Sequence, residues 1–174
     1  MKKTYVLDTN VLIQAPYAVD CFEENTVVLP MTVLEELDNM KKEEGEKGAN
    51  VRKVIRILDA HREKGNLLEG VRMEWGGILR VEKNYRNVEL PPDLPEHKSD
   101  NRILKVCVGL SNDLKEQVIL VTKDILLRIK AQLLGIQAED FGTEQVAVHE
   151  EQYLGRREVF VPEELFKDFK KKGV

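Results

Sequence analysis

Two aspartates, Asp8 and Asp124, each stand at the end of a short run of aliphatic and β-branched residues. The runs, residues 4–7 and 118–121, have the composition of buried strands. Because the carboxyl ends of parallel strands meet at one edge of a sheet, we expect these two carboxylates to be neighbours although they are far apart in the sequence. Each aspartate taken alone is more simply explained as the cap of a following helix.

Two further acids are expected on the inner faces of helices. Helical spacing places Glu36 at the border of the apolar face that contains Leu37, and Glu35 nearly opposite, in solvent. Asp100 shares a stripe with Ile103 on a later helix. Carboxylates at such half-buried positions need compensation, because a carboxylate avoids burial unless it is paired or bound to a metal.

The four acids together predict a metal site. Carboxylates that lie close together cannot all remain ionised without a cation. Oxygen ligands without histidine or cysteine favour Mg²⁺ or Mn²⁺, as one or two ions. The two cysteines and three histidines lack the spacing of a zinc site. Such an acid cluster suits phosphodiester hydrolysis by metal-activated water. The predicted site consists of Asp8, Glu36, Asp100 and Asp124.

Composition limits the classes of protein. The chain has 174 residues, of which 42% are hydrophobic and 33% charged, with a formal net charge of −4. This is the size of one domain with a short appendage, and apolar enough to fold. An acidic chain does not coat nucleic acid non-specifically, so contact with nucleic acid would be local or mediated by a metal. No apolar run is long enough for a membrane span, and we expect a soluble, cytoplasmic protein without a membrane partner.

The periodicity predicts alternating strands and helices. This alternation predicts an α/β fold with a mainly parallel central sheet covered on both faces, a three-layer α/β/α arrangement, plus an inserted β-hairpin built on Gly76 and Gly77. The polar loops 41–48 and 84–97 are expected at the rim of the substrate site. The expected strands are residues 4–7, 26–29, 118–121 and 136–138, with residues 71–75 and 78–81 in the hairpin. The expected helices begin at Val11, follow the cap Thr32 through Met40, run over residues 49–64 and 99–110, and follow the cap Asp124 as far as Gly135.

Four short segments resemble the motifs of the PIN domain, a nuclease fold, and occur in the family's order. The resemblance implies that Asp8, Glu36, Asp100 and Asp124 are the catalytic, metal-binding acids and that the substrate is single-stranded RNA. Glu36 is preferred over Glu35 because the family's acid precedes the leucine, and the helical-face argument selects the same residue. The segments are residues 8–12 (DTNVL), 34–38 (LEELD), 99–104 (SDNRIL) and 120–124 (LVTKD).

A closer resemblance is to the PIN half of PhoH-like proteins, in which the nuclease domain precedes a PhoH ATPase domain. It implies a PIN-like domain over residues 1–145, followed by a linker or the start of an absent PhoH-like ATPase domain over residues 146–174. The sequence contains no Gly-x-x-x-x-Gly-Lys-Ser/Thr loop, so ATPase activity is not assigned to it. The similar segments are residues 48–52 (GANVR), 75–79 (WGGIL), 127–131 (LRIKA) and 153–155 (YLG).

The candidate substrate contacts are basic or hydroxyl residues near the acids. The candidate phosphate contacts are Arg52, Arg102, Arg128 and Lys123. An ordinary solvated charge is the favoured alternative for each, and only Lys123 and Arg102, which flank site acids, stand above it. Thr122 is a candidate for positioning a metal-bound water. In the expected mechanism Asp8, Glu36 and Asp124 hold the first ion, Asp100 completes the site or binds a second, and metal-bound water attacks in line with the departing oxygen.

Two other functions stay open from the sequence. One is a non-catalytic RNA-binding or regulatory module attached to an ATPase, and the other is a toxin endoribonuclease of the VapC type, which the hairpin and the tail fit less well. The sequence leaves open RNA against DNA, the base sequence recognised, the assignment of acids to ions, and whether the chain forms a homo-oligomer.

Overall fold

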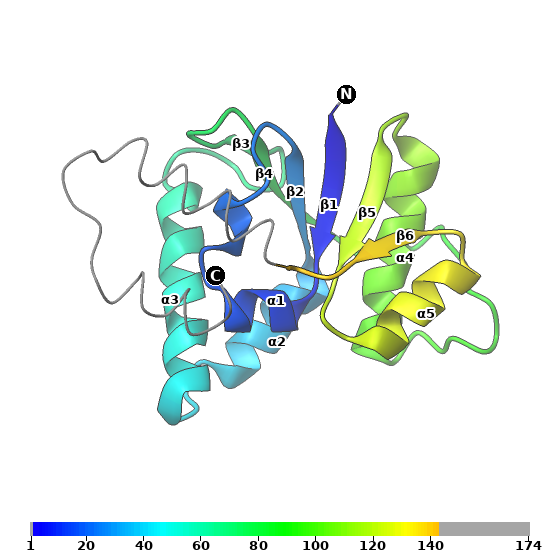
Figure 1. Cartoon of the computed structure of the whole chain (residues 1–174), viewed down its shortest axis with the longest axis horizontal. Coiled ribbons are helices and arrows are strands. Elements are labelled where there is room, and N and C mark those ends of the chain that lie inside the picture. Colours follow the sequence, from blue (N-terminus) through cyan, green and yellow to red (C-terminus); the bar gives the residue numbers. More distant parts are fainter. Residues whose placement is uncertain (1, 143–174) are drawn as a thin grey trace. The chain divides into compact units, whose positions relative to one another are not determined.

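The computed structural model describes residues 2–142, and residues 1–140 form one compact unit. A six-stranded sheet runs through this unit in the order β3-β4-β2-β1-β5-β6 (Figure 1). Its strands are β1 (Lys3–Leu7), β2 (Thr26–Pro30), β3 (Val71–Arg72), β4 (Ile78–Glu82), β5 (Gln117–Val121) and β6 (Gln137–Glu139). The domain boundary expected at residue 145 lies outside the described residues.

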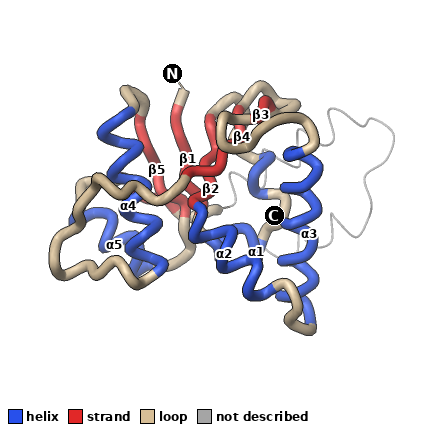
Figure 2. Tube along the Cα trace, turned by 180° about the vertical axis from the view of Figure 1, so that it is seen from behind, coloured by secondary structure: helices blue, strands red, loops and turns tan. Residues whose placement is uncertain are grey.

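Helices flank the sheet, which gives the expected three-layer arrangement (Figure 2). None of the helices within residues 2–142 has the length and apolar character needed to cross a bilayer. The helices are α1 (Thr9–Gln14), the short 3₁₀ helix η1 (Ala18–Asp20), α2 (Met31–Met40), α3 (Gly45–Arg62), α4 (Ser99–Asp113) and α5 (Ile125–Leu133).

The central strands are buried because their residues are apolar on both faces. Every residue of β2 after Thr26 is buried, and so is every residue of β5 after Gln117. This pattern is typical of parallel strands covered by helices on both sides. The pairs β1–β2, β1–β5, β2–β4 and β5–β6 are all parallel, and only β3–β4 is antiparallel.

The hairpin differs from the expected insertion. Its second strand, β4, pairs in parallel with β2 and so belongs to the central sheet. The turn is also longer than two residues, because β3 ends at Arg72 and β4 begins only at Ile78. Gly77 passes close to the chain before β2: a Cβ on Gly77 would lie 2.5 Å from the carbonyl oxygen of Asn25. That close approach, rather than a two-residue turn, explains the glycine.

Residues 83–98 are held against α4. The buried Lys105 forms an ion pair of 2.8 Å with Glu96, and the Asn101 side-chain amide donates to the Pro95 carbonyl oxygen at 2.8 Å. The ring of Tyr85 lies over Gly109, where a Cβ would come within 2.3 Å of the ring. The long proline-containing loop is therefore fixed along the same helix that carries Asp100.

Substitution of Gly109 by valine should displace the Tyr85 ring and lower the free energy of unfolding by about 1–3 kcal/mol, the usual cost of overpacking. Thermal unfolding of the two proteins tests this. Ser111→Val is the matched control, because Ser111 is exposed on the same helix and the change carries the same β-branched penalty. Equal stability of the two variants would contradict the packing role of Gly109.

Candidate active site

The central strand β1 ends at the point where the chain connections diverge. The neighbours of β1 are β2 on one side and β5 on the other, and all three strands run parallel. In open α/β sheets a crevice forms at such a point, beyond the carboxyl ends of the strands. Asp8 follows β1 directly, and its backbone amide donates to the carbonyl oxygen of Val121 at the end of β5 at 3.0 Å. Asp8 therefore lies at the sheet edge where such a crevice is expected.

The Asp8 carboxylate is buried, with 6% of the residue exposed, and is held by two donors. The Thr122 hydroxyl donates to Asp8 Oδ2 at 2.6 Å, and the Thr9 amide donates to Asp8 Oδ1 at 2.7 Å. Thr122 reaches Asp8 because β1 and β5 are paired in register up to Leu7 and Val121. Both carboxylate oxygens are thus oriented by residues that lie just beyond the ends of two adjacent parallel strands.

Glu36 is connected to Asp8 through Thr9. The Thr9 hydroxyl donates to Glu36 Oε1 at 2.7 Å, while the backbone amide of the same residue donates to Asp8. The Ser99 hydroxyl, in the first turn of α4, donates to the other oxygen of Glu36 at 3.3 Å. Glu35 is exposed, as the helical-face argument predicts. Glu36, on α2, therefore links the first residue of α1 with the first residue of α4.

The electrostatic neighbours of Asp8 are two other acids. The pKa of Asp8 is raised to about 6, mainly by burial and also by the charges of Asp100 and Glu36, against the lowering effect of the bonds from Thr122 and Thr9. Like charges near a buried carboxylate favour its protonated form. Asp8, Glu36 and Asp100 thus form one electrostatically coupled acid group, named here the acid triad.

Asp124 lies at the edge of the acid triad. Its Oδ1 accepts from the amides of Leu126 at 2.9 Å and Leu127 at 3.4 Å, so its carboxylate caps α5. The Asp124 amide donates to the Thr122 hydroxyl oxygen at 3.1 Å, which connects it to Asp8 through one residue. The ends of β1 and β5 thus lie next to each other, as expected. Asp124 also caps α5, as the alternative explanation predicts.

The predicted substrate contacts occupy three different settings. Lys123 forms an ion pair of 3.1 Å with Asp140 and lies between Thr122 and Asp124. Arg102, two residues after Asp100, donates to the His97 carbonyl oxygen at 3.3 Å. Arg52 lies on α3 and donates to the carbonyl oxygens of Lys41 and Glu43, so it closes the loop between α2 and α3. Thr122 and Lys123 are therefore bonded to or adjacent to the acids, whereas the bonds of Arg52 hold a loop.

Sequence reasoning did not identify Thr9 and Ser99 as partners of Glu36. Lys98 occupies the cap position of α4, so Ser99 is the first helical residue, and its hydroxyl donates to Glu36. A hydroxyl beside each of two motif acids, Asp8 and Asp100, is a pattern in the sequence that could have indicated these contacts.

The donor chemistry of the acid triad fits a hard divalent cation. Its ligands would be carboxylate oxygens, and the pKa of Asp8 is raised by burial and, to a smaller extent, by the charges of Asp100 and Glu36. Within residues 2–142, however, no three acidic, histidine or cysteine side chains converge closely enough to form a finished metal-binding cluster. A cation would therefore draw these carboxylates together.

Substitution of Thr122 by valine should raise the pKa of Asp8 above its present value near 6, because the lost hydroxyl bond favours the ionised form. The unpaired oxygen should also cost about 1–3 kcal/mol of stability. A carboxyl NMR titration and thermal unfolding measure the two effects. Thr26→Val, at the start of β2, is the matched control, and an unchanged Asp8 pKa would contradict the proposed role of the Thr122 hydroxyl.

Acids at the carboxyl ends of the central parallel strands of an α/β sheet define a PIN-type, nuclease-like module, and the chain belongs to the PIN domain family, whose model matches residues 5–142. PIN domains are generally nucleases and typically use divalent metal ions.

The relatives include proteins named PhoH2. Protein PhoH2 of Bacillus subtilis (strain 168) is 46% identical over 175 residues, which is 97% of this chain and 40% of that protein. Protein PhoH2 of Mycolicibacterium smegmatis is 39% identical over 149 residues, which is 84% of this chain and 34% of that protein. The chain thus spans about two fifths of the length of the first of these relatives.

Among solved structures, a PilT N-terminus domain protein from Sulfolobus solfataricus P2 aligns with a TM-score of 0.48 and 11% identity, over 83% of this chain and 92% of that one.

Proposed function

We propose that the chain is a Mg²⁺- or Mn²⁺-dependent endoribonuclease that hydrolyses single-stranded RNA in the cytoplasm, as the nuclease half of a PhoH-like ATPase protein. The observation that supports it best is the acid triad, in which a buried Asp8 with a pKa near 6 is coupled to Glu36 and Asp100. The similarity to proteins named PhoH2 favours this setting over a toxin of the VapC type.

In this proposal Asp8, Glu36 and Asp100 would hold the cation, with Asp124 available beside Thr122. When bound, a divalent ion supplies an activated water and neutralises charge on the phosphodiester. Thr122 and Thr9 keep both Asp8 oxygens oriented, and Thr9 with Ser99 does the same for Glu36. Asp8 must give up its proton to become a ligand, so cation binding and proton release are coupled.

The test is cleavage of an end-labelled single-stranded RNA by the purified chain with Mg²⁺ or Mn²⁺, next to DNA of the same sequence. A chelator and the Asp8→Asn variant serve as controls. Cleavage of RNA that both controls abolish is the expected result. A folded chain that cleaves none of several RNAs with either metal would overturn the proposal.

The capping of α5 by Asp124 favours a second candidate, a non-catalytic RNA-binding module attached to the ATPase. With that carboxylate bonded to two backbone amides, one fewer acid is free to bind a cation. Binding of the same RNA without cleavage, and with equal affinity in the presence of chelator, is the result that this candidate predicts.

A further inference from the structure

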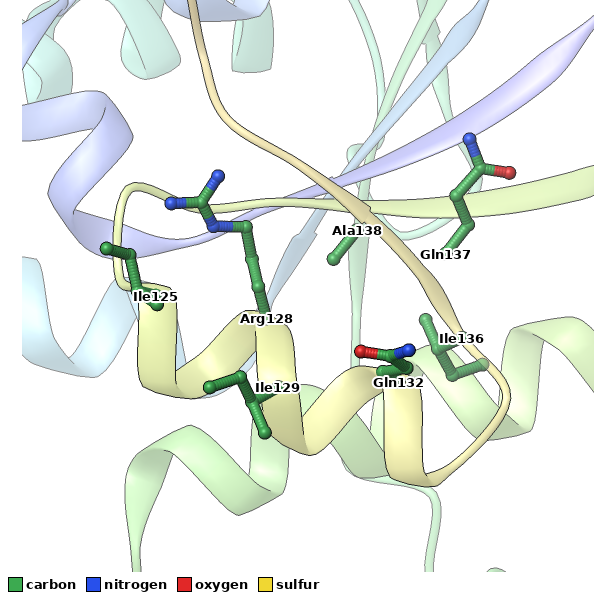
Figure 3. A pocket seen from close by; sticks show the side chains of 7 residues that line it. All are labelled: Ile125, Arg128, Ile129, Gln132, Ile136, Gln137 and Ala138. Carbon is green, nitrogen blue, oxygen red and sulfur yellow. The ribbon is translucent and has the colours of Figure 1, made fainter.

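A groove runs between α5 and β6, beside the acid triad. Figure 3 shows its lining: the apolar side chains of Ile125, Ile129 and Ile136, and the polar side chains of Arg128, Gln132 and Gln137. Ile125 and Ile129 are 64% and 49% exposed, unusual values for large aliphatic residues of a helix whose opposite face is buried. The groove thus has an exposed apolar wall and one positively charged side chain, that of Arg128.

Arg128 is the charged group of this groove. Its Nε has no solvent-accessible surface and no hydrogen-bond partner in the part of the chain that the structure describes. An unpaired buried donor is costly, so an acceptor that reaches it is favoured. Figure 3 shows the guanidinium lying toward the end of the groove where α5 begins. A phosphate oxygen is the acceptor that a guanidinium binds best with two parallel bonds.

The groove is linked to the site through the first turn of α5. Arg128 lies one helical turn, about 6 Å along the axis, after the α5 cap Asp124, and its amide donates to the Asp124 carbonyl oxygen. The Thr122 hydroxyl then joins Asp124 to Asp8. One nucleotide of an extended strand spans about this distance. A strand whose phosphodiester meets the acid triad would therefore place a neighbouring nucleotide in the groove.

We propose that the α5–β6 groove is a subsite for one nucleotide of single-stranded RNA next to the scissile bond. Arg128 binds the phosphate of that nucleotide, its base lies on Ile125 and Ile129, and the exposed Gln132 amide faces the base edge. The inference rests on the proposed ribonuclease function. The groove lining contains no acidic residue, so its charge is complementary to RNA although the whole chain is acidic.

The first test is binding of a fluorescein-labelled single-stranded RNA oligonucleotide to the whole chain, by anisotropy in Ca²⁺ under conditions in which a gel shows the RNA intact. Arg128→Gln should weaken binding about tenfold and reduce the dependence on salt by about one phosphate contact. Ile129→Ser should weaken binding severalfold. Lys53→Gln is the matched control, because it removes one exposed charge from α3. Equal affinities of Arg128→Gln and Lys53→Gln would overturn the proposal.

The second test locates the base. RNA that carries 4-thiouridine should form its ultraviolet crosslink to the peptide containing residues 125–129, and a crosslink only elsewhere would overturn the proposal. Light scattering of the same variants covers the alternative that a second copy of the chain occupies this apolar wall. A dimer that Ile129→Ser dissociates, with RNA affinity unchanged, would assign the groove to that contact and overturn the subsite.

A small diester separates this inference from the proposed function. Bis(4-nitrophenyl) phosphate carries a single phosphate, which cannot contact the acid triad and Arg128 at the same time. Arg128→Gln should therefore reduce its hydrolysis with Mn²⁺ far less than the tenfold by which it weakens RNA binding. If the unaltered chain hydrolyses neither this diester nor RNA, the nuclease proposal fails while the binding and crosslinking results still decide the subsite. A parallel loss of diester hydrolysis in Arg128→Gln would place Arg128 in the acid site and overturn the subsite.

Discussion

Substitution of Glu36 by glutamine should lower the rate of RNA cleavage roughly 10²- to 10³-fold, whereas the same change at Glu35 should leave it nearly unaltered. The expected factor is what the loss of one group that stabilises charge in the transition state usually costs. Glu36 is bonded to Thr9 and Ser99 beside Asp8, and Glu35 is exposed on the same helix turn. The measurement is the initial rate with saturating Mn²⁺ at pH 8.

Glu35 and Glu36 are adjacent, so the two variants are closely matched. Both substitutions remove one charge from neighbouring residues of α2, so they change the net charge and the local helix propensity alike. Glutamine can still accept from Thr9 and Ser99, so the fold of the site should survive, which thermal unfolding checks. Equal rates for the two variants would show that Glu36 is not part of the reacting site.

Substitution of Asp8 by asparagine should stabilise the metal-free chain at neutral pH by up to about 3 kcal/mol, the equivalent of the pKa difference between 3.8 and about 6. Because the pKa of Asp8 is higher in the folded state than in the unfolded state, ionisation of Asp8 opposes folding. Below about pH 4 Asp8 is protonated in both states, so this penalty is absent. The penalty grows as the pH rises from 4 to 6 and is complete above 6.

The stability difference between Asp8→Asn and the unaltered chain should therefore appear between pH 4 and pH 6 and stay constant above. Urea unfolding in chelator over this range measures it, with exposed Asp93→Asn as the control. Mg²⁺ should stabilise the unaltered chain more than Asp8→Asn, because the cation compensates the buried charge. A variant that is less stable than the unaltered chain at pH 7.5 in chelator would show that Asp8 is not destabilised by its setting.

Much of this arrangement follows from local patterns in the sequence. Uninterrupted apolar runs predicted β1, β2 and β5, and their end points placed Asp8 and Asp124 at one edge. Helical spacing distinguished Glu36 from Glu35. These predictions succeed because a strand that is buried on both faces is an uninterrupted apolar run in the sequence. The 100° step of a helix likewise determines which residues of a sequence share one face.

The remaining features depend on pairing between distant segments. The parallel pairing of β4 with β2, which brings the hairpin into the sheet, is set by which edge is available after β2 and β1 have paired, and no residue pattern records it. The same holds for the hydroxyl of Thr122 on Asp8, since it requires the register of β1 against β5. Asp124 could not be assigned because a cap and a ligand require the same residue type.

The pairing of β1 with β5 also determines when the site comes into existence. Asp8 and Glu36 emerge early during synthesis, but Asp100 and Thr122 belong to segments made much later, and strand β5 joins β1 only after Val121 has left the ribosome. A chain that ends before residue 100 lacks one member of the acid triad, and a chain that ends before residue 122 lacks the hydroxyl that holds Asp8. The site is therefore completed only late in synthesis, when the first strand of the chain pairs with its fifth.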